Sequence, residues 1–179
     1  MNYLILLILT IFSNLSYSQN LVEIEKQLLI LVNEERASRS LTTFITDSLI
    51  NNAAKIHAKY LSTIMSFQQV SHTNPNPKYR KPWDRIKIAS NSKYRNSSEN
   101  VTAFTINTPK TDLEIAVQAH TNFMNSKPHK MNVLKEGIDV FDKGFISPSH
   151  YGHCVVYNER INAIIVVQMF PSLNYGYAP

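Results

Sequence analysis

The sequence predicts an α+β fold in which helices cover an antiparallel β-sheet. Apolar residues recur at helical spacing over the earlier part of the chain, and two runs rich in β-branched residues stand near its end. Helices first and strands last are typical of a layered α+β arrangement. The 179 residues contain no repeat and no low-complexity tract. We therefore expect one domain with a single architecture.

The N-terminal segment has the pattern of a secretory signal peptide. Residues 3–12 form a short apolar run, and Ser16-Tyr17-Ser18 places small residues at the positions that a signal peptidase reads. The run is too short to span a membrane, and no cysteine lies near the expected cleavage point to carry a lipid. We expect residues 1–18 to be a signal peptide and residues 19–179 to be a single domain. The expected location is secreted or periplasmic, without a transmembrane anchor.

Three long helices are predicted from apolar spacing and capping residues. The first begins near residue 21 and ends near residues 38–40. The second follows Asp47, a plausible N-cap. The third starts at Thr111, which forms a capping box with Glu114, and runs to about Asn125.

Irregular structure and strands are predicted for the remainder. Residues 71–96 are rich in Asn, Pro, Ser and basic residues, and only a short helix at residues 83–87 is expected to interrupt them. A strand is expected at residues 100–105. Residues 152–157 and 163–170 flank a polar turn, which predicts an antiparallel hairpin.

Charge and cysteine content narrow the classes of function. The net charge is +5, and much of the excess lies in one stretch that contains Lys78, Arg80, Lys81, Arg85, Lys87, Lys93 and Arg95. Such a patch can attract wall polymers, acidic lipids or nucleic acid, and the alternative is an ordinary solvated loop. Cys154 is the only cysteine, so the exported chain folds without an intramolecular disulfide. Its valine neighbours favour a small core residue over a reactive thiol.

Candidate site residues stand at the edges of the predicted elements. His72 follows a helical stretch, Glu99 stands in Ser98-Glu99-Asn100-Val101, and His129 ends Ser126-Lys127-Pro128-His129. Two imidazoles and one carboxylate in this order are suited to one polar cleft. His57 is expected to be a satisfied interior residue that borders it.

These segments resemble the CAP superfamily, also called the SCP domain, and most closely its short bacterial secreted branch. The resemblance covers about residues 25 to 170 and consists of seven short motifs in the family's order. They are Leu31-Val32-Asn33-Glu34-Glu35-Arg36-Ala37, Ala53-Ala54-Lys55-Ile56-His57-Ala58, His72, Arg85-Ile86, Ser98-Glu99-Asn100-Val101, Ser126-Lys127-Pro128-His129 and Val166-Val167-Gln168-Met169-Phe170.

The resemblance implies an α-β-α sandwich with a central antiparallel sheet and a cleft lined by two histidines and acidic residues. His72, Glu99 and His129 occupy the matching positions. Eukaryotic members supply a second Glu where this chain has Ser126, their usual Trp is Phe123, and their Gly before the signature Glu is Ser98. A triad therefore replaces the family's tetrad.

The triad suits weak zinc binding. Two neutral imidazoles and one carboxylate from His72, Glu99 and His129 would leave a fourth coordination position open for water. No other cofactor is expected. The alternative is that Glu99 accepts hydrogen bonds from the backbone or from one histidine and holds the loop without a metal.

Three classes of function are consistent with the sequence. The favoured class is a secreted binding or interaction module whose cleft takes a small ligand, a lipid or an extracellular polymer. The second is a zinc hydrolase that uses the same cleft, and the third is a structural or defence protein with a relic cleft. No Ser or Cys can be assigned as a nucleophile, which favours the first class over the second. We expect a monomer with no specific nucleic-acid partner.

Overall fold

The computed structural model describes residues 19–134 and 150–173, and all side chains among them except those of residues 95, 172 and 173. The predicted signal peptide, residues 1–18, lies outside the described residues. The elements are α1 (Leu21–Ala37), β1 (Ile45–Thr46), α2 (Ser48–Leu61), η1 (Phe67–Gln69), η2 (Pro77–Tyr79), α3 (Pro82–Ala89), β2 (Tyr94–Thr105), α4 (Asp112–Asn125), α5 (Lys127–Leu134), β3 (His150–Asn158) and β4 (Ala163–Leu173).

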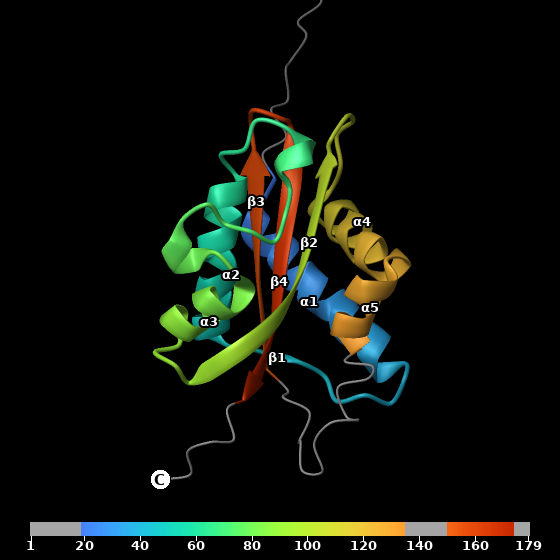
Figure 1. Cartoon of the computed structure of the whole chain (residues 1–179). Helices are drawn as coiled ribbons and strands as arrows, with labels where there is room; N and C mark the ends of the chain where they lie inside the picture. Colours follow the sequence, from blue (N-terminus) through green and yellow to red (C-terminus); the bar gives the residue numbers. More distant parts are fainter. Residues whose placement is uncertain (1–18, 135–149, 174–179) are drawn as a thin grey trace, which may run out of the picture.

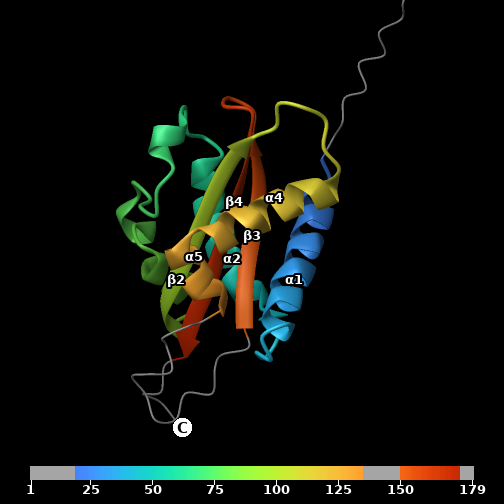
Figure 2. The same ribbon diagram turned by 90° about the vertical axis from the view of Figure 1, so that its right-hand side faces the viewer.

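A four-stranded sheet in the order β1-β3-β4-β2 forms the middle layer. Strand β4 pairs antiparallel with both β2 and β3, while the short β1 pairs with β3 in parallel. Helices α2 and α3 cover one face, and α1, α4 and α5 cover the other (Figures 1 and 2). The expected α-β-α sandwich is confirmed, with the parallel β1–β3 pair as an addition.

Strand β4 lies at the centre and is apolar on both faces. Ile164 and Val166 pack in the core beneath α1, α4 and α5, whereas Ile165 and Val167 pack in the core beneath α2 and α3. All four side chains are fully buried. Burial on both faces explains the uninterrupted apolar run from Ala163 to Val167 in this strand. The predicted hairpin of β3 and β4 is confirmed.

Local capping fixes the helix starts at the predicted positions. Oδ1 of Asp47 accepts a hydrogen bond from the Leu49 N–H at 2.8 Å. Thr111 and Glu114 form the reciprocal capping box of α4, which ends at Asn125 as predicted. None of the helices in residues 19–134 combines the length and apolar character that a bilayer crossing requires.

Two elements differ from the prediction. Strand β2 begins at Tyr94, six residues before the expected strand, and its first half is polar. That strand lies at a sheet edge, where fewer side chains need to be apolar than in a central strand. Helix α5 was not expected, because it is short and has no pronounced apolar stripe. Burial of Val133 and Leu134 in the core holds it in place.

Gly152 allows α2 to lie directly against β3. A Cβ atom at this position would lie 2.5 Å from the backbone carbon of Ile50 and 2.6 Å from the backbone nitrogen of Asn51. Both atoms belong to the first turn of α2, so no side-chain rotation can make room. Any larger residue would displace the helix that carries His57.

Candidate functional site

The candidate site is built around β2, the edge strand of the sheet. Glu99 and Asn100 are neighbours on this strand, and successive side chains of a strand point to opposite faces. Glu99 contacts residues of α2 and α3, whereas Asn100 contacts the backbone of α5. One strand therefore presents a carboxylate to one helical layer and an amide to the other.

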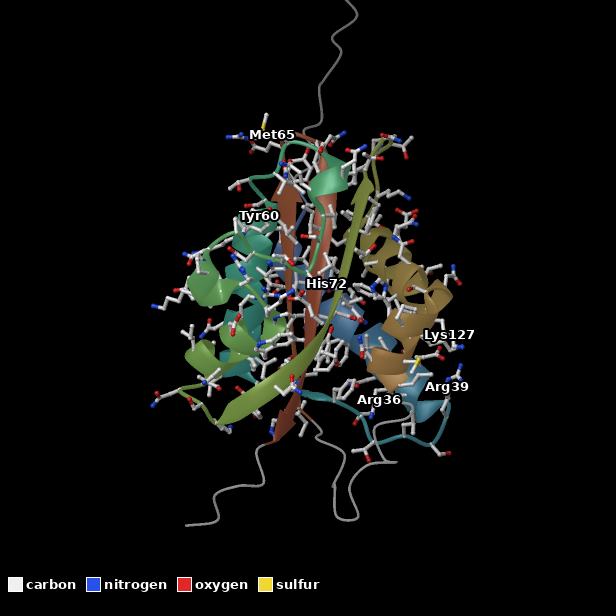
Figure 3. The ribbon with its side chains drawn as sticks, in the orientation of Figure 1. Arg36, Arg39, Tyr60, Met65, His72 and Lys127 are labelled. Atoms are coloured by element: carbon white, nitrogen blue, oxygen red, sulfur yellow. The ribbon has the colours of Figure 1, made fainter. Side chains whose placement is uncertain are left out.

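Glu99 orients the ring of His72. Nδ1 of His72 lies 2.9 Å from Oε1 of Glu99, whose side chain is fully buried. A carboxylate at neutral pH only accepts hydrogen bonds, so Nδ1 carries the proton and donates it. In the neutral ring, Nε2 then holds the free lone pair. The His72 side chain is 51% exposed, and it lies beside the middle of β2 (Figure 3).

Arg85 connects the same carboxylate to the loop that carries His72. Its side chain is fully buried, and Nη2 donates to Oε2 of Glu99. The guanidinium also donates to the backbone carbonyls of His72, Tyr79 and Arg80. Because one side chain bonds both strand and loop, Arg85 fixes residues 72–80 against β2.

His57 on α2 completes the buried side of the cluster. Its Nε2 lies 2.7 Å from the carbonyl oxygen of Ser71, which only accepts, so Nε2 donates to the loop. Nε2 also lies 3.8 Å from Oε1 of Glu99. Burial lowers the pKa of His57, with Glu99 opposing that shift, so the ring is neutral at neutral pH and makes no ion pair. The expected interior position is confirmed.

His129 approaches from the other helical layer. Its ring makes an edge contact with Phe123, with centroids 5.6 Å apart. Burial lowers the pKa of His129, and a positive charge on His72 would lower it further. Ser126 lies at the junction of α4 and α5, and within the described ranges its side chain makes no hydrogen bond to the three other predicted site residues.

A buried amide network holds α5 against the sheet. Nδ2 of Asn100 lies 3.0 Å from the carbonyl oxygen of His129 and 3.1 Å from Oε1 of Gln168. Asn132 donates to Oδ1 of Asn100 at 2.8 Å, and Gln168 donates to the hydroxyl of Tyr151 at 2.9 Å. The position of the His129 backbone is therefore set by the residue next to Glu99.

Among the predicted metal ligands, the imidazoles of His72 and His129 are better placed to bind a metal than the carboxylate of Glu99. Both oxygens of Glu99 already accept hydrogen bonds, one from His72 and one from Arg85, so the carboxylate is less available to a metal than a free one. Residues 19–134 and 150–173 contain no group of three His, Cys, Asp or Glu side chains arranged to hold a metal ion. The arrangement matches the carboxylate–histidine pairs that orient metal ligands from behind. The central cleft stays a prediction.

Sequence reasoning missed the part of Arg85 in this site. The sequence placed Arg85 in a basic stretch and in a family motif before the first strand, and neither pointed to a buried ion pair. Its partner Glu99 is fourteen residues away and on another element, so no local spacing connects them. The one signal was that a buried carboxylate requires a compensating cation.

Cys154 belongs to the core rather than to this site. It packs with residues of α2 and the sheet, and burial raises the pKa of its thiol to about 12. The expected small core residue is confirmed. Such a thiol is a poor nucleophile at neutral pH.

Solved structures of extracellular bacterial proteins share this architecture. An outer surface protein of Borrelia burgdorferi matches with a TM-score of 0.61 and 19% identity, over 85% of this chain and 94% of that one. An extracellular SCP-domain protein of Bacillus anthracis matches with a TM-score of 0.55 and 19% identity, over 83% of this chain and 40% of that one. The chain has the CAP fold. A cysteine-rich secretory protein of Staphylococcus aureus gives a TM-score of 0.52 at 13% identity, over 85% of this chain and 40% of that one.

The CAP likeness lies in the fold and not in close sequence similarity. No protein-family model matches the sequence, and no curated protein matches it significantly. The chain spans less than half the length of the Bacillus and Staphylococcus proteins. Function therefore has to be argued from the site itself.

Proposed function

We propose that the protein is an extracellular binding module of CAP fold, in which His72 and His129 contact the ligand on either side of β2. The observation that carries this proposal is the hydrogen bond from Nδ1 of His72 to the buried carboxylate of Glu99. It fixes the tautomer and aims an unprotonated Nε2 away from the carboxylate, on a side chain that is half exposed. Arg85 and His57 hold the surrounding loop, so the ring is positioned before any ligand arrives.

The ligand of this site is a group that imidazole nitrogens recognise: a hydrogen-bond donor or a soft divalent cation. Zinc is preferred to magnesium, because imidazole suits zinc and magnesium prefers oxygen ligands. His72 and His129 would hold the ion, and Glu99 would act on it through His72. Bound zinc would supply a Lewis acid to polarise a ligand oxygen. With two imidazoles and no free carboxylate, the affinity is weak. A small ligand, a lipid or an extracellular polymer remains the class of partner proposed.

Secretion is part of the same proposal. It rests on the signal-peptide pattern of residues 1–18, and the neighbours of CAP fold carry the names of outer surface or extracellular proteins. N-terminal sequencing of the exported protein is expected to begin at Gln19. Intact Met1 in a cytoplasmic pool would contradict export.

A zinc hydrolase is the second candidate, favoured by one observation. An imidazole with a buried carboxylate behind it is the base-and-orienter pair of many hydrolytic sites, and it could activate a water molecule. The test is cleavage of a peptide or phosphodiester substrate in the presence of zinc. Activity in the wild type that is lost in His72→Ala would show that the protein is an enzyme and not only a binding module.

The test of the proposed site is zinc titration calorimetry on the wild-type protein, His72→Ala and His129→Ala, at pH 7.5 and 5.5. Each substitution is expected to weaken binding at pH 7.5 by about tenfold or more, because one of two nitrogen ligands is lost. The wild type is expected to lose at least about tenfold at pH 5.5, because a metal binds only neutral imidazoles and each ligand of ordinary pKa, about 6.5, is about tenfold less available there.

His150→Ala is the matched control, because His150 lies at the start of β3, outside the cluster. It is expected to bind zinc as the wild type does. Equal affinities in wild type, His72→Ala and His129→Ala would remove zinc from the proposal.

A further inference from the structure

A pocket lies on the surface formed by η2 and α3, outside the His72–Glu99 cluster. Its volume is about 450 Å³, and it is lined by Pro77, Lys78, Asp84, Lys87, Ile88, Asn91 and Ser92. Its lysines come from two elements, Lys78 from η2 and Lys87 from α3. All lining residues lie within residues 77–92, and the contact of η2 with α3 brings the two lysines to one pocket.

Four basic side chains in and beside the pocket have no acidic partner within the described residues. Lys78, Arg80, Lys81 and Lys87 make no ion pair in the described part of the chain. Two further cations nearby are already paired: Arg85 is buried against Glu99, and Lys93 lies 3.3 Å from Asp47. The unpaired cations create a positive potential that neighbouring groups do not neutralise.

Asp84, the one acidic residue that lines the pocket, caps the start of α3. Oδ2 of Asp84 accepts a hydrogen bond from the Lys81 N–H at 2.9 Å, at the start of α3. Asp84 offsets one lysine of the pocket, while Arg80 and Lys81 flank it from the turn between η2 and α3. The balance of charge at this surface stays positive.

The remaining wall supplies hydrogen-bond donors. Asn91 and Ser92 both have positive φ, 48° and 66°, and turn the chain back after α3. Their backbone N–H groups already bond to the carbonyls of Ile88 and Lys87. Their side chains make no hydrogen bond within residues 19–134 and 150–173, so an amide and a hydroxyl are available to a ligand oxygen.

We propose that this pocket binds a linear polyanion, with one anionic group between Lys78 and Lys87 and the adjoining groups along Arg80 and Lys81. The concave pocket with its amide and hydroxyl suits a discrete oxyanion, which a flat basic face does not. The unpaired cations extend beyond the pocket, which suits a repeating polymer more than a single small anion.

The test measures binding of long-chain inorganic polyphosphate to the full mature chain, read by the fluorescence of Trp83. This is the only tryptophan in the sequence, and it stands on α3, partly exposed beside the pocket residue Asp84. Lys78→Gln/Lys87→Gln is the site variant. Lys26→Gln/Lys127→Gln removes the same charge from exposed positions of α1 and α5, in the opposite helical layer (Figure 1).

The site variant is expected to lose at least tenfold in affinity at 100 mM salt, and the control less than twofold. Each neutralised anionic group contributes about −0.7 to −0.9 to the slope of log affinity against log salt, so the site variant should reduce that slope by about 1.5. Equal losses in both variants would overturn the proposal. The proposal would also be overturned if orthophosphate bound as tightly as polyphosphate at the same concentration of phosphate groups. Binding to acidic phospholipid vesicles without binding to polyphosphate would overturn it as well. The lysines of the pocket are not zinc ligands of the proposed function, so zinc titration of the Lys78→Gln/Lys87→Gln variant is expected to match the wild type and separates the two proposals.

Discussion

Nδ1 of His72 and Oε1 of Glu99 lie 2.9 Å apart, and their hydrogen bond joins an exposed loop to a buried carboxylate of the edge strand β2. The carboxylate is also the partner of Arg85, so one buried group serves both the fold and the candidate site. Substitutions that separate these two roles are the most informative.

Breaking the buried ion pair is expected to be costly. Glu99→Gln leaves the guanidinium of Arg85 without a countercharge in the interior, and it should lower the free energy of unfolding by about 3–5 kcal/mol. Urea denaturation measures this directly. His72→Ala, which keeps the ion pair and removes a half-exposed ring, is expected to cost about 1 kcal/mol or less.

The double variant Arg85→Met/Glu99→Leu is the control for this interpretation. It removes both charges. Its loss of unfolding free energy is expected to be smaller, by about 2 kcal/mol or more, than the sum of the losses in Arg85→Met and Glu99→Leu. Additive losses would show that the two side chains are not coupled.

Asn100 is expected to stabilise α5 and position His129. Asn100→Ala leaves the His129 carbonyl and the buried Oε1 of Gln168 without this donor, which should cost about 2–3 kcal/mol. Zinc affinity should fall with it, because the α5 backbone is released. Asn132→Ala breaks only the bond to Oδ1 of Asn100 and should cost about 1 kcal/mol. If both substitutions lowered the zinc affinity equally, Asn100 would have no special role in positioning His129.

His153 is expected to destabilise the protein in acid. Burial lowers its pKa to about 4, and its hydrogen bond to the Glu25 carbonyl only partly opposes that shift. The unfolded chain binds a proton near pH 6.5 and the folded chain does not, so stability is complete above pH 6.5 and falls between about pH 6.5 and 4. The loss at pH 4.5 is about 2–3 kcal/mol.

His153→Gln isolates this contribution. The variant keeps a donor for the Glu25 carbonyl but does not titrate, so its deficit in stability at pH 7.5 should shrink or reverse by pH 4.5. His150→Gln on the same strand should show no such convergence. A pH-independent difference between wild type and His153→Gln would contradict the buried neutral state of the ring.

Cys154 is expected to be inert in the folded protein. The residue is 8% exposed and the pKa of its thiol is about 12, so a thiol reagent should react at least about a hundredfold more slowly in buffer than in urea. With one cysteine in the chain, dithiothreitol should leave the melting temperature unchanged. Melting several degrees lower in reductant would indicate an intermolecular disulfide.

Features set by local chemistry were predictable from the sequence. The caps at Asp47 and Thr111 depend on side chains within three residues of the helix starts, and both were placed correctly. The β3–β4 hairpin follows from two β-branched runs beside a short turn. His72, Glu99 and His129 were assigned by their match to the family's motifs, and such a match does not give their contacts.

Features set by distant contacts were not predictable in the same way. Strand β2 starts in a polar segment, and only its pairing with β4 makes it a strand from Tyr94 onward. Arg85 looks like one more basic residue of a basic stretch until the fold places it beside Glu99. The role of Glu99 as a hydrogen-bond acceptor for one histidine was an open alternative, and the partner on its second oxygen decides how freely it could coordinate a metal.

The central claim is that Glu99 holds His72 with a protonated Nδ1 and a free Nε2 that a ligand can reach. Long-range ¹H–¹⁵N spectra of the histidine rings at pH 7.5, recorded with and without zinc, test it most directly. We expect His72 in the Nδ1–H tautomer, with zinc shifting the ¹⁵N signals of His72 and His129 and leaving that of His150 in place. An Nε2–H tautomer of His72, or zinc shifts confined to other histidines, would contradict the account.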